Sequence, residues 1–330
     1  MKLRYAPSFV CTKCEESLFV NTKLSEGKEI KEGEMNCLNC GQVFPIRDGI
    51  PIFISKLDDI KKHTAKSFGY KWKKFDKINE YYKKNFLDEL EPLDYRNFFR
   101  GKSILDAGTG IGIPCYCIAE NGAKEVFAAD ISDSVRAAYN NNSRFDNVTI
   151  AQGDIYALPF KKNSFDVVVC VAVLQHLPDP QKAFDILLNF VKPGGTLIIW
   201  VYAKEGNFWV RYFVEPFRKL ISRKLPLNAV LTASYVFTGI FSIVSKCIYK
   251  PLNDHNLKCL PLHDYIMYRT NFDYATNVQM IFDQLLAPLS DFFSKKEIEA
   301  LFNRPDVMNV VIRHHNRNSW TAIGDKVSAH

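Results

Sequence analysis

The chain lacks the strong charge imbalance and the leading apolar run that mark several classes of protein. Its 330 residues carry 43 Lys or Arg and 36 Asp or Glu, and this formal charge of +7 requires neither a nucleic-acid nor a membrane partner. Residues 1–7 contain no apolar signal core, so we expect no secretory peptide. Hydrophobic residues make up 47% and charged residues 24% of the chain, which excludes wholesale disorder.

Cysteine is present in an odd number, nine, which does not suit a framework of disulfides and favours a reducing, cytoplasmic location. Four of the cysteines form two Cys-x-x-Cys pairs, Cys11 with Cys14 and Cys37 with Cys40, with 22 residues between them. Each pair can supply two corners of a tetrahedron, so the spacing predicts a zinc ribbon in residues 1–55. Four thiolates leave no open position for water, so the metal is expected to be structural.

The stretch SILDAGTGIG, residues 103–112, runs from an apolar strand into a turn that has glycine at alternate positions. Glycine permits a tight turn and the close approach of a ligand, and residues 113–120 follow as a helix. Asp130 ends a second apolar strand about twenty residues later, where a carboxylate can take both hydroxyls of a ribose. Ile113 stands where a dinucleotide-binding turn has its third glycine, so a ligand without phosphates is favoured.

Further strands are predicted for residues 147–154, 165–171 and a stretch that ends at Trp200. Strands that alternate with helices in this way predict a parallel α/β sheet. Asp154 closes the third strand, and its carboxylate can accept a hydrogen bond from an exocyclic amine such as that of adenine. The alternative is that Asp130 and Asp154 only cap the helices that follow them.

In this order the motifs resemble the class I S-adenosylmethionine-dependent methyltransferases, in particular the type 11 branch with Gly-Asp-x-x-x-Leu-Pro-Phe (residues 153–160) and Leu-x-His-x-x-Asp-Pro (residues 174–180). The resemblance covers residues 100–203 and resumes near the C-terminus. It implies an α/β fold with a Rossmann-like seven-stranded sheet, a terminal antiparallel hairpin, and S-adenosylmethionine as cofactor. The cofactor-binding residues that it implies are Asp106, Gly108, Thr109, Gly110, Gly112, Asp130, Ile131, Asp154, Ile155, Val171 and Gln175.

By the same resemblance, His176 lies beside the reactive methyl group and is the candidate general base, since the pKa of a histidine is close to neutrality. It could instead only orient a loop. Residues 56–100 are expected to form a helical cap over the cofactor, in which Tyr70 or Trp72 covers the cofactor or stacks on the substrate. Aromatic residues at helical spacing are also consistent with simple core packing.

Residues 42–53 resemble the zinc-ribbon activator proteins that partner certain methyltransferases, here fused to the core. One family of ribosomal RNA guanine methyltransferases also carries an N-terminal zinc element, so an RNA methyltransferase is the alternative function. Glutamates outnumber lysines between the two cysteine pairs, which weakens an RNA-binding role for the ribbon.

An insertion follows the fifth strand, and residues 225–245 within it contain no charged residue but have Lys and Arg on both sides. Polar residues recur along one helical stripe and apolar residues along the other. The polar stripe consists of Asn228, Thr232, Tyr235, Thr238, Ser242 and Ser245. Such an amphipathic helix is typical either of a lid packed on its own domain or of peripheral contact with a membrane, which would indicate a lipid-linked sugar or a quinone-like lipid as acceptor.

The sequence therefore predicts a methyltransferase that acts on a small-molecule or lipid-linked acceptor. A catalytically inactive cofactor-binding regulator is the alternative from another class. The predicted domains are a zinc ribbon (1–55), a helical cap (56–100), the methyltransferase core (101–204), a helical insertion or substrate lid (205–275), and a C-terminal helix with a strand hairpin (276–330).

Overall fold

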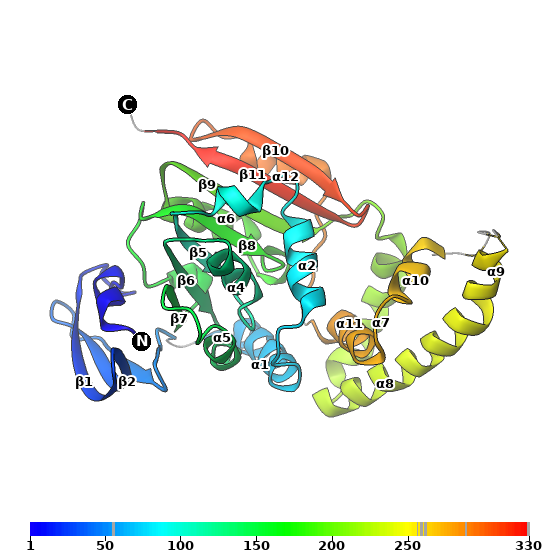
Figure 1. Cartoon of the computed structure of the whole chain (residues 1–330), viewed down its shortest axis with the longest axis horizontal. Coiled ribbons are helices and arrows are strands. Elements are labelled where there is room, and N and C mark those ends of the chain that lie inside the picture. Colours follow the sequence, from blue (N-terminus) through cyan, green and yellow to red (C-terminus); the bar gives the residue numbers. More distant parts are fainter. Residues whose placement is uncertain (55–56, 256, 258–259, 261–262, 288, 329–330) are drawn as a thin grey trace. The chain divides into compact units, whose positions relative to one another are not determined.

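The computed structural model describes residues 1–54, 57–255, 257, 260, 263–287 and 289–328. The chain divides into two compact units, one formed by Met1–Phe208 together with Leu289–His330 and the other by Trp209–Pro288. The first unit contains the ribbon and the large sheet, and the second is helical (Figure 1).

The ribbon is a four-stranded antiparallel sheet in which consecutive strands are neighbours. A short 3-10 helix, η1 (Leu3–Ser8), precedes it. The segment between the two cysteine pairs forms an antiparallel hairpin of β1 and β2. The strands are β1 (Leu18–Glu26), β2 (Glu29–Cys37), β3 (Val43–Arg47) and β4 (Ile50–Pro51).

The large sheet has seven strands in the order β10-β11-β9-β8-β5-β6-β7. The five strands β5 to β9 run parallel, whereas β11 pairs antiparallel with both β9 and β10. The predicted Rossmann-like sheet with a terminal antiparallel hairpin is thus confirmed. The strands are β5 (Ser103–Ala107), β6 (Glu125–Asp130), β7 (Val148–Gln152), β8 (Phe165–Val171), β9 (Val191–Tyr202), β10 (Val307–His315) and β11 (Ser319–Lys326).

Helices cover both faces of this sheet because successive strand residues point to opposite sides. Ile104 belongs to a hydrophobic core with α2, α4 and α5, and its neighbour Leu105 belongs to a second core with α6, α12 and the ribbon. The helices of this unit are α1 (Asp59–Lys74), α2 (Glu80–Glu89), α3 (Tyr95–Phe98), α4 (Ile113–Glu120), α5 (Val135–Asn141), α6 (Pro180–Phe190) and α12 (Lys295–Phe302).

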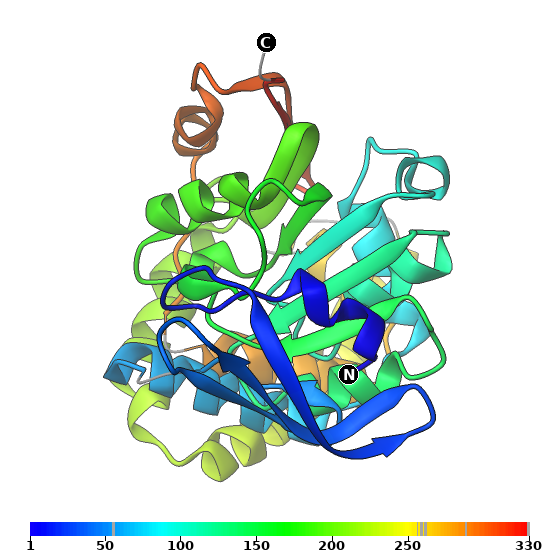
Figure 2. The same ribbon diagram turned by 90° about the vertical axis from the view of Figure 1, so that its left-hand side faces the viewer.

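The ribbon packs against the β7 edge of the large sheet (Figure 2). Ile52 forms a parallel bridge with Gln152, and the backbone N–H of Phe53 donates to the Gln152 carbonyl at 2.8 Å. Phe9, which is buried, lies 5.4 Å from both Phe53 and Phe160, measured between ring centroids. Ribbon and sheet therefore share one hydrophobic core.

The second unit is built around α8 (Leu227–Val244), which packs on α11 (Tyr274–Leu286). The Tyr274 hydroxyl donates to the carbonyl of Tyr235 at 2.7 Å. Because α11 packs on α8, this unit runs to residue 288, past the boundary at 275 that the sequence predicts. The remaining elements are the π-helices η4 (Val210–Val214) and η6 (Ser245–Tyr249), the 3-10 helix η5 (Ser222–Lys224), α7 (Glu215–Leu220), α9 (Lys250–Asp254) and α10 (His263–Arg269).

Burial along α8 does not follow the polar stripe noted in the sequence, since Asn228, Thr232 and Tyr235 of that stripe are exposed whereas Thr238 is buried. Ser234 and Thr238 are fully buried, and each hydroxyl donates to the backbone carbonyl four residues earlier. Val236, Ile240 and Ile243 are instead exposed, by 56%, 53% and 65%. A small hydroxyl side chain that bonds its own helix allows a neighbouring helix to approach closely, so the hydroxyl residues can be the ones that pack.

Candidate functional site

The turn between β5 and α4 is held to β6 by backbone hydrogen bonds, since the N–H groups of Gly108 and Thr109 both donate to the carbonyl of Ala129. Gly108 has a φ of +88°, and a Cβ on it would lie 2.3 Å from a methyl group of Val173. A Cβ on Gly112, where φ is +87°, would lie 2.3 Å from the side-chain nitrogen of Asn142. Both positions therefore require glycine.

Asp130 lies at the end of β6 and fastens this turn. One carboxylate oxygen accepts the Gly110 N–H at 2.9 Å, and the other accepts the N–H and the hydroxyl of Ser132 at 2.8 and 2.7 Å. The side chain does not cap α5, whose N-cap is Ser134. Two carboxylate oxygens offer about four acceptor positions, so Asp130 can still accept hydrogen bonds from a ligand.

Asp154, at the end of β7, does act as a cap. One oxygen accepts the Tyr156 N–H at 3.0 Å at the start of the 3-10 helix η2 (Ile155–Ala157), and the other forms an ion pair with Lys61 at 2.7 Å. Lys61 comes from α1 and was not singled out in the sequence. Ile155 is buried directly behind this carboxylate in the chain.

Two of the predicted cofactor-binding residues carry buried polar atoms without partners. Within the described residues, neither carboxylate oxygen of Asp106 and neither amide atom of Gln175 has a hydrogen-bond partner. Burial raises the pKa of Asp106 to about 7. Unpartnered buried polar atoms are costly, so their presence at the carboxyl ends of β5 and β8 fits a polar ligand.

Helix α1 lies across the carboxyl ends of these strands. A Cβ on Gly110 would lie 3.3 Å from the indole nitrogen of Trp72, and one on Gly69 would lie 3.7 Å from the backbone nitrogen of Asp133. The hydroxyl of Ser67 is buried without a partner in the described part of the chain. We call the turn, Asp106, Asp130, Asp154, Gln175 and the overlying α1 the carboxyl-end site.

The contribution of α1 was not predicted from the sequence, apart from its aromatic residues Tyr70 and Trp72. Lys61, Thr64, Phe68 and Lys71 are spaced by three or four positions and so share one face of the helix. Lys71 is buried, and its amino group lies 3.9 Å from the centre of the Trp72 ring. That spacing, with a lysine at each end, is the signal that could have identified the face. Tyr70 is half-buried on the same helix.

His176 follows β8 in the 3-10 helix η3 (Leu174–His176) and is buried. Its Nδ1 lies 2.6 Å from the carbonyl oxygen of Leu289, and its ring lies 5.0 Å from that of Phe68 on α1. Because a carbonyl can only accept, Nδ1 carries the proton in the neutral ring and Nε2 is the basic nitrogen. The histidine thus lies in contact with the helix that covers the carboxyl-end site.

The four ribbon cysteines come together in space. Their sulfur atoms all lie within 4.8 Å of one another, with 3.5 Å between Cys11 and Cys40 and 3.4 Å between Cys14 and Cys37. A tetrahedral zinc with Zn–S bonds of about 2.3 Å places its sulfur ligands about 3.8 Å apart. The donor set and its spacing therefore fit one structural zinc ion.

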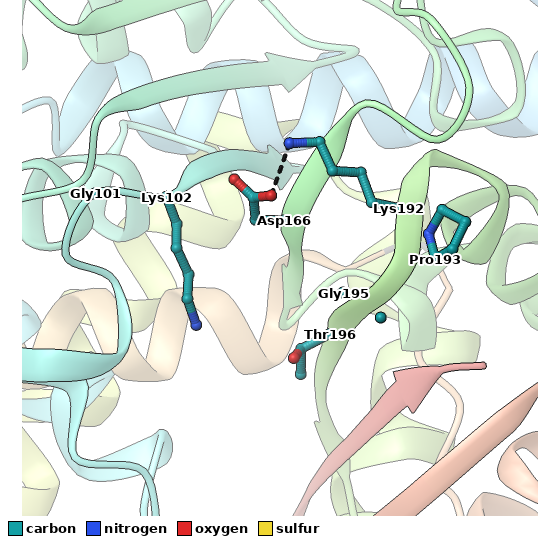
Figure 3. Close-up of a pocket in the computed structure, with 8 residues that line it drawn as sticks. Gly101, Lys102, Asp166, Lys192, Pro193, Gly195 and Thr196 are labelled. Atoms are coloured by element: carbon teal, nitrogen blue, oxygen red, sulfur yellow. Dashed lines mark hydrogen bonds and ion pairs between the residues drawn. The ribbon is translucent and has the colours of Figure 1, made fainter. Parts of the chain in front are cut away.

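A cavity of about 370 Å³ lies at the amino ends of the parallel strands, where β5, β8 and β9 begin (Figure 3). The ammonium of Lys192 reaches across to Asp166 at 2.7 Å, and the same carboxylate accepts the Ser103 N–H. Because its lining residues lie at the amino ends of the strands, this cavity is separate from the carboxyl-end site. The lining residues are Gly101, Lys102, Asp166, Lys192, Pro193, Gly194, Gly195 and Thr196.

Two segments of the chain match known families. Residues 105–199 match the family described as "Methyltransferase domain", and residues 9–49 match the family described as "Trm112p-like protein". The chain contains a methyltransferase domain. The methyltransferase domain spans β5 to β9, and the Trm112p-like segment contains all four cysteines.

Among similar proteins, ubiquinone biosynthesis O-methyltransferase from Paraburkholderia phymatum is 34% identical over 39% of this chain and 56% of its own length. The enzyme of that name from Neisseria meningitidis is 30% identical over 44% of this chain and 62% of its own length. The chain thus spans less than two thirds of these relatives. The complex between the Haloferax volcanii Trm112 methyltransferase activator and a methyltransferase aligns with 83% of this chain and 100% of the matched chain, at 13% identity and a TM-score of 0.44.

Proposed function

We propose that this protein transfers a methyl group from S-adenosylmethionine to a small-molecule or lipid-linked acceptor, with a quinone-like ring hydroxyl as the favoured class. The observation that carries the proposal is the carboxyl-end site: a glycine turn fastened by Asp130 beside the buried, unpartnered carboxylate of Asp106. The match of residues 105–199 to a methyltransferase domain supports the reaction, and the ubiquinone O-methyltransferase relatives support the acceptor class.

When bound, S-adenosylmethionine supplies an electrophilic methyl group on a sulfonium. In the proposed arrangement, Asp130 accepts hydrogen bonds from the ribose hydroxyls, and Asp106 with the turn at residues 108–112 holds the methionine part. Asp154 and Ile155 hold the adenine, which requires Lys61 to share or release one Asp154 oxygen. We assign the remaining cofactor contacts to Thr109, Ile131, Val171 and Gln175. Tyr70 and Trp72 on α1 are assigned to cover the cofactor or stack on the substrate.

The chain's own contribution to the reaction is orientation, exclusion of water and removal of one proton. Helix α1 lies over the turn, and we assign to it the exclusion of water from the bound cofactor. His176 is assigned as the general base, since its Nδ1 is held by the Leu289 carbonyl and Nε2 can accept a proton from an acceptor hydroxyl.

The function is tested by incubating the purified chain with methyl-labelled S-adenosylmethionine and separate pools of hydroxylated aromatic metabolites, membrane lipids and RNA. We expect label in the metabolite or lipid pool, detected by mass spectrometry. Label in RNA alone would favour an RNA methyltransferase. Cofactor binding without product in any pool would favour an inactive regulator, and either result contradicts the proposal.

Replacing His176 with asparagine should lower the methyl-transfer rate constant by about a hundredfold, the size of a general-base contribution, without changing cofactor affinity. The asparagine amide can still donate to the Leu289 carbonyl, so the fold should be kept. His315→Asn is the matched control, because His315 is also buried but lies on β10 beside Asp88. Equal single-turnover rates for His176→Asn and the control would show that His176 only positions the loop.

A further inference from the structure

The second unit presents an apolar surface built from Trp209, η4, α7 and α8. Trp209 stacks on Phe213 at 4.9 Å, and Phe217 lies 6.4 Å from Phe237 of α8. The surface continues along α8 from Phe237, because residues three or four apart on a helix are neighbours. We call this the outer apolar surface; it comprises Trp209, Phe213, Phe217, Val236, Phe237, Ile240 and Ile243, all exposed by 36% to 65%.

The segment that carries the outer apolar surface is mainly basic. Residues 206–254 contain seven Lys or Arg and two acidic residues, Glu215 and Asp254. Glu215 is itself buried and paired with Arg218 and Lys219. Lys224 precedes α8 and Lys246 and Lys250 follow it, and all three are exposed. An apolar surface flanked by lysines is complementary to the apolar acyl-chain layer and the anionic headgroups of a membrane.

We propose that the outer apolar surface docks in the interface of an anionic lipid membrane, with α8 lying along the membrane plane. Aromatic side chains suit the boundary between headgroups and acyl chains, and flanking lysines interact with anionic lipids. This deepens the proposed function, because docking would bring the domain to a lipid-linked acceptor, but the docking itself needs no methyl transfer.

The described helix run Leu227–Asp254 is long and apolar enough to cross a membrane, with a mean hydropathy of 1.7 in its most apolar window. The opposite face of α8 argues for lying in the interface. That face buries Ser234 and Thr238 and packs on α11, whose Tyr274 bonds the α8 backbone. One face is thus occupied by protein, and only the other is left for lipid.

Vesicle flotation of the full chain tests the proposal. We expect the protein to float with vesicles of phosphatidylcholine mixed with phosphatidylglycerol, and to bind phosphatidylcholine alone at least tenfold more weakly. Ile240→Asp should lower the partition on the order of tenfold or more, because it places a charge in the apolar layer. Lys246→Glu with Lys250→Glu should remove the preference for anionic vesicles and leave weak binding to both kinds.

Leu24→Asp on β1 is the matched control for Ile240→Asp, since Leu24 is 52% exposed and Ile240 is 53% exposed. It should float like the unchanged protein. Circular dichroism and cofactor affinity of Ile240→Asp establish that it is folded, and they also separate failure of docking from failure of the proposed function. Equal flotation of Ile240→Asp and Leu24→Asp overturns the proposal. So does a dimer in light scattering that Ile240→Asp converts to a monomer, because a second copy would then cover the surface.

Discussion

Asp130→Ala is expected to weaken the binding of S-adenosylmethionine on the order of a hundredfold or more. The substitution removes the acceptor of the ribose hydroxyls, and a hydrogen bond to a charged group contributes about 1.5 to 3 kcal/mol. It also leaves the Gly110 and Ser132 N–H groups without the carboxylate that they bond, which loosens the turn that faces the ligand. Isothermal titration calorimetry measures the change directly.

Asp133→Ala is the control for this variant. Asp133 lies three residues further along, is exposed, and forms a hydrogen bond of 3.3 Å with Gln152. Its loss should change cofactor affinity less than about threefold, as for most surface substitutions. Affinity in Asp130→Ala that stays as high as in Asp133→Ala would contradict the assignment of the ribose to Asp130.

Cys37→Ser should produce the largest loss of stability among the substitutions considered. Removing one thiolate breaks a tetrahedral site whose zinc contributes folding energy, and we expect unfolding to become easier by about 3 kcal/mol or more. Because Phe9 and other ribbon residues share one core with the sheet, the loss should reach the whole first unit. A fall of about 10 °C in its thermal midpoint corresponds to a change of that size.

Zinc content and calorimetric scans check this expectation. Cys247→Ser is the matched control, because Cys247 is exposed on η6 and is not part of the cysteine cluster. It should keep one equivalent of zinc and an unchanged midpoint, whereas Cys37→Ser and chelation of the unchanged protein should both lose the metal. A metal-free Cys37→Ser chain with the midpoint of the control would show that the ribbon is held by its packing alone.

The local features of the fold could be predicted from the sequence because each depends on neighbouring residues. The apolar run 165–171 became β8, and the residues after the glycine turn became α4. The cysteine spacing likewise placed four sulfurs in one cluster.

Features that depend on distant partners could not be predicted in this way. The pairing of Lys61 with Asp154 joins positions 93 residues apart, and the bridge from Ile52 to Gln152 joins the ribbon to the sheet edge. The inward face of α8 could not be predicted because a helical stripe shows that two faces differ, not which of them packs. Thr238 satisfies its own hydroxyl within the helix, so burial does not penalise it.

A crystal structure of the chain grown with S-adenosylhomocysteine tests the proposed cofactor site. We expect the ribose hydroxyls to lie within hydrogen-bond distance of the Asp130 carboxylate, under α1 and beside the glycine turn. We also expect that Lys61 no longer holds its Asp154 oxygen alone. A ligand bound instead in the cavity beside Lys192 and Asp166, or a different occupant at the carboxyl-end site, would contradict it.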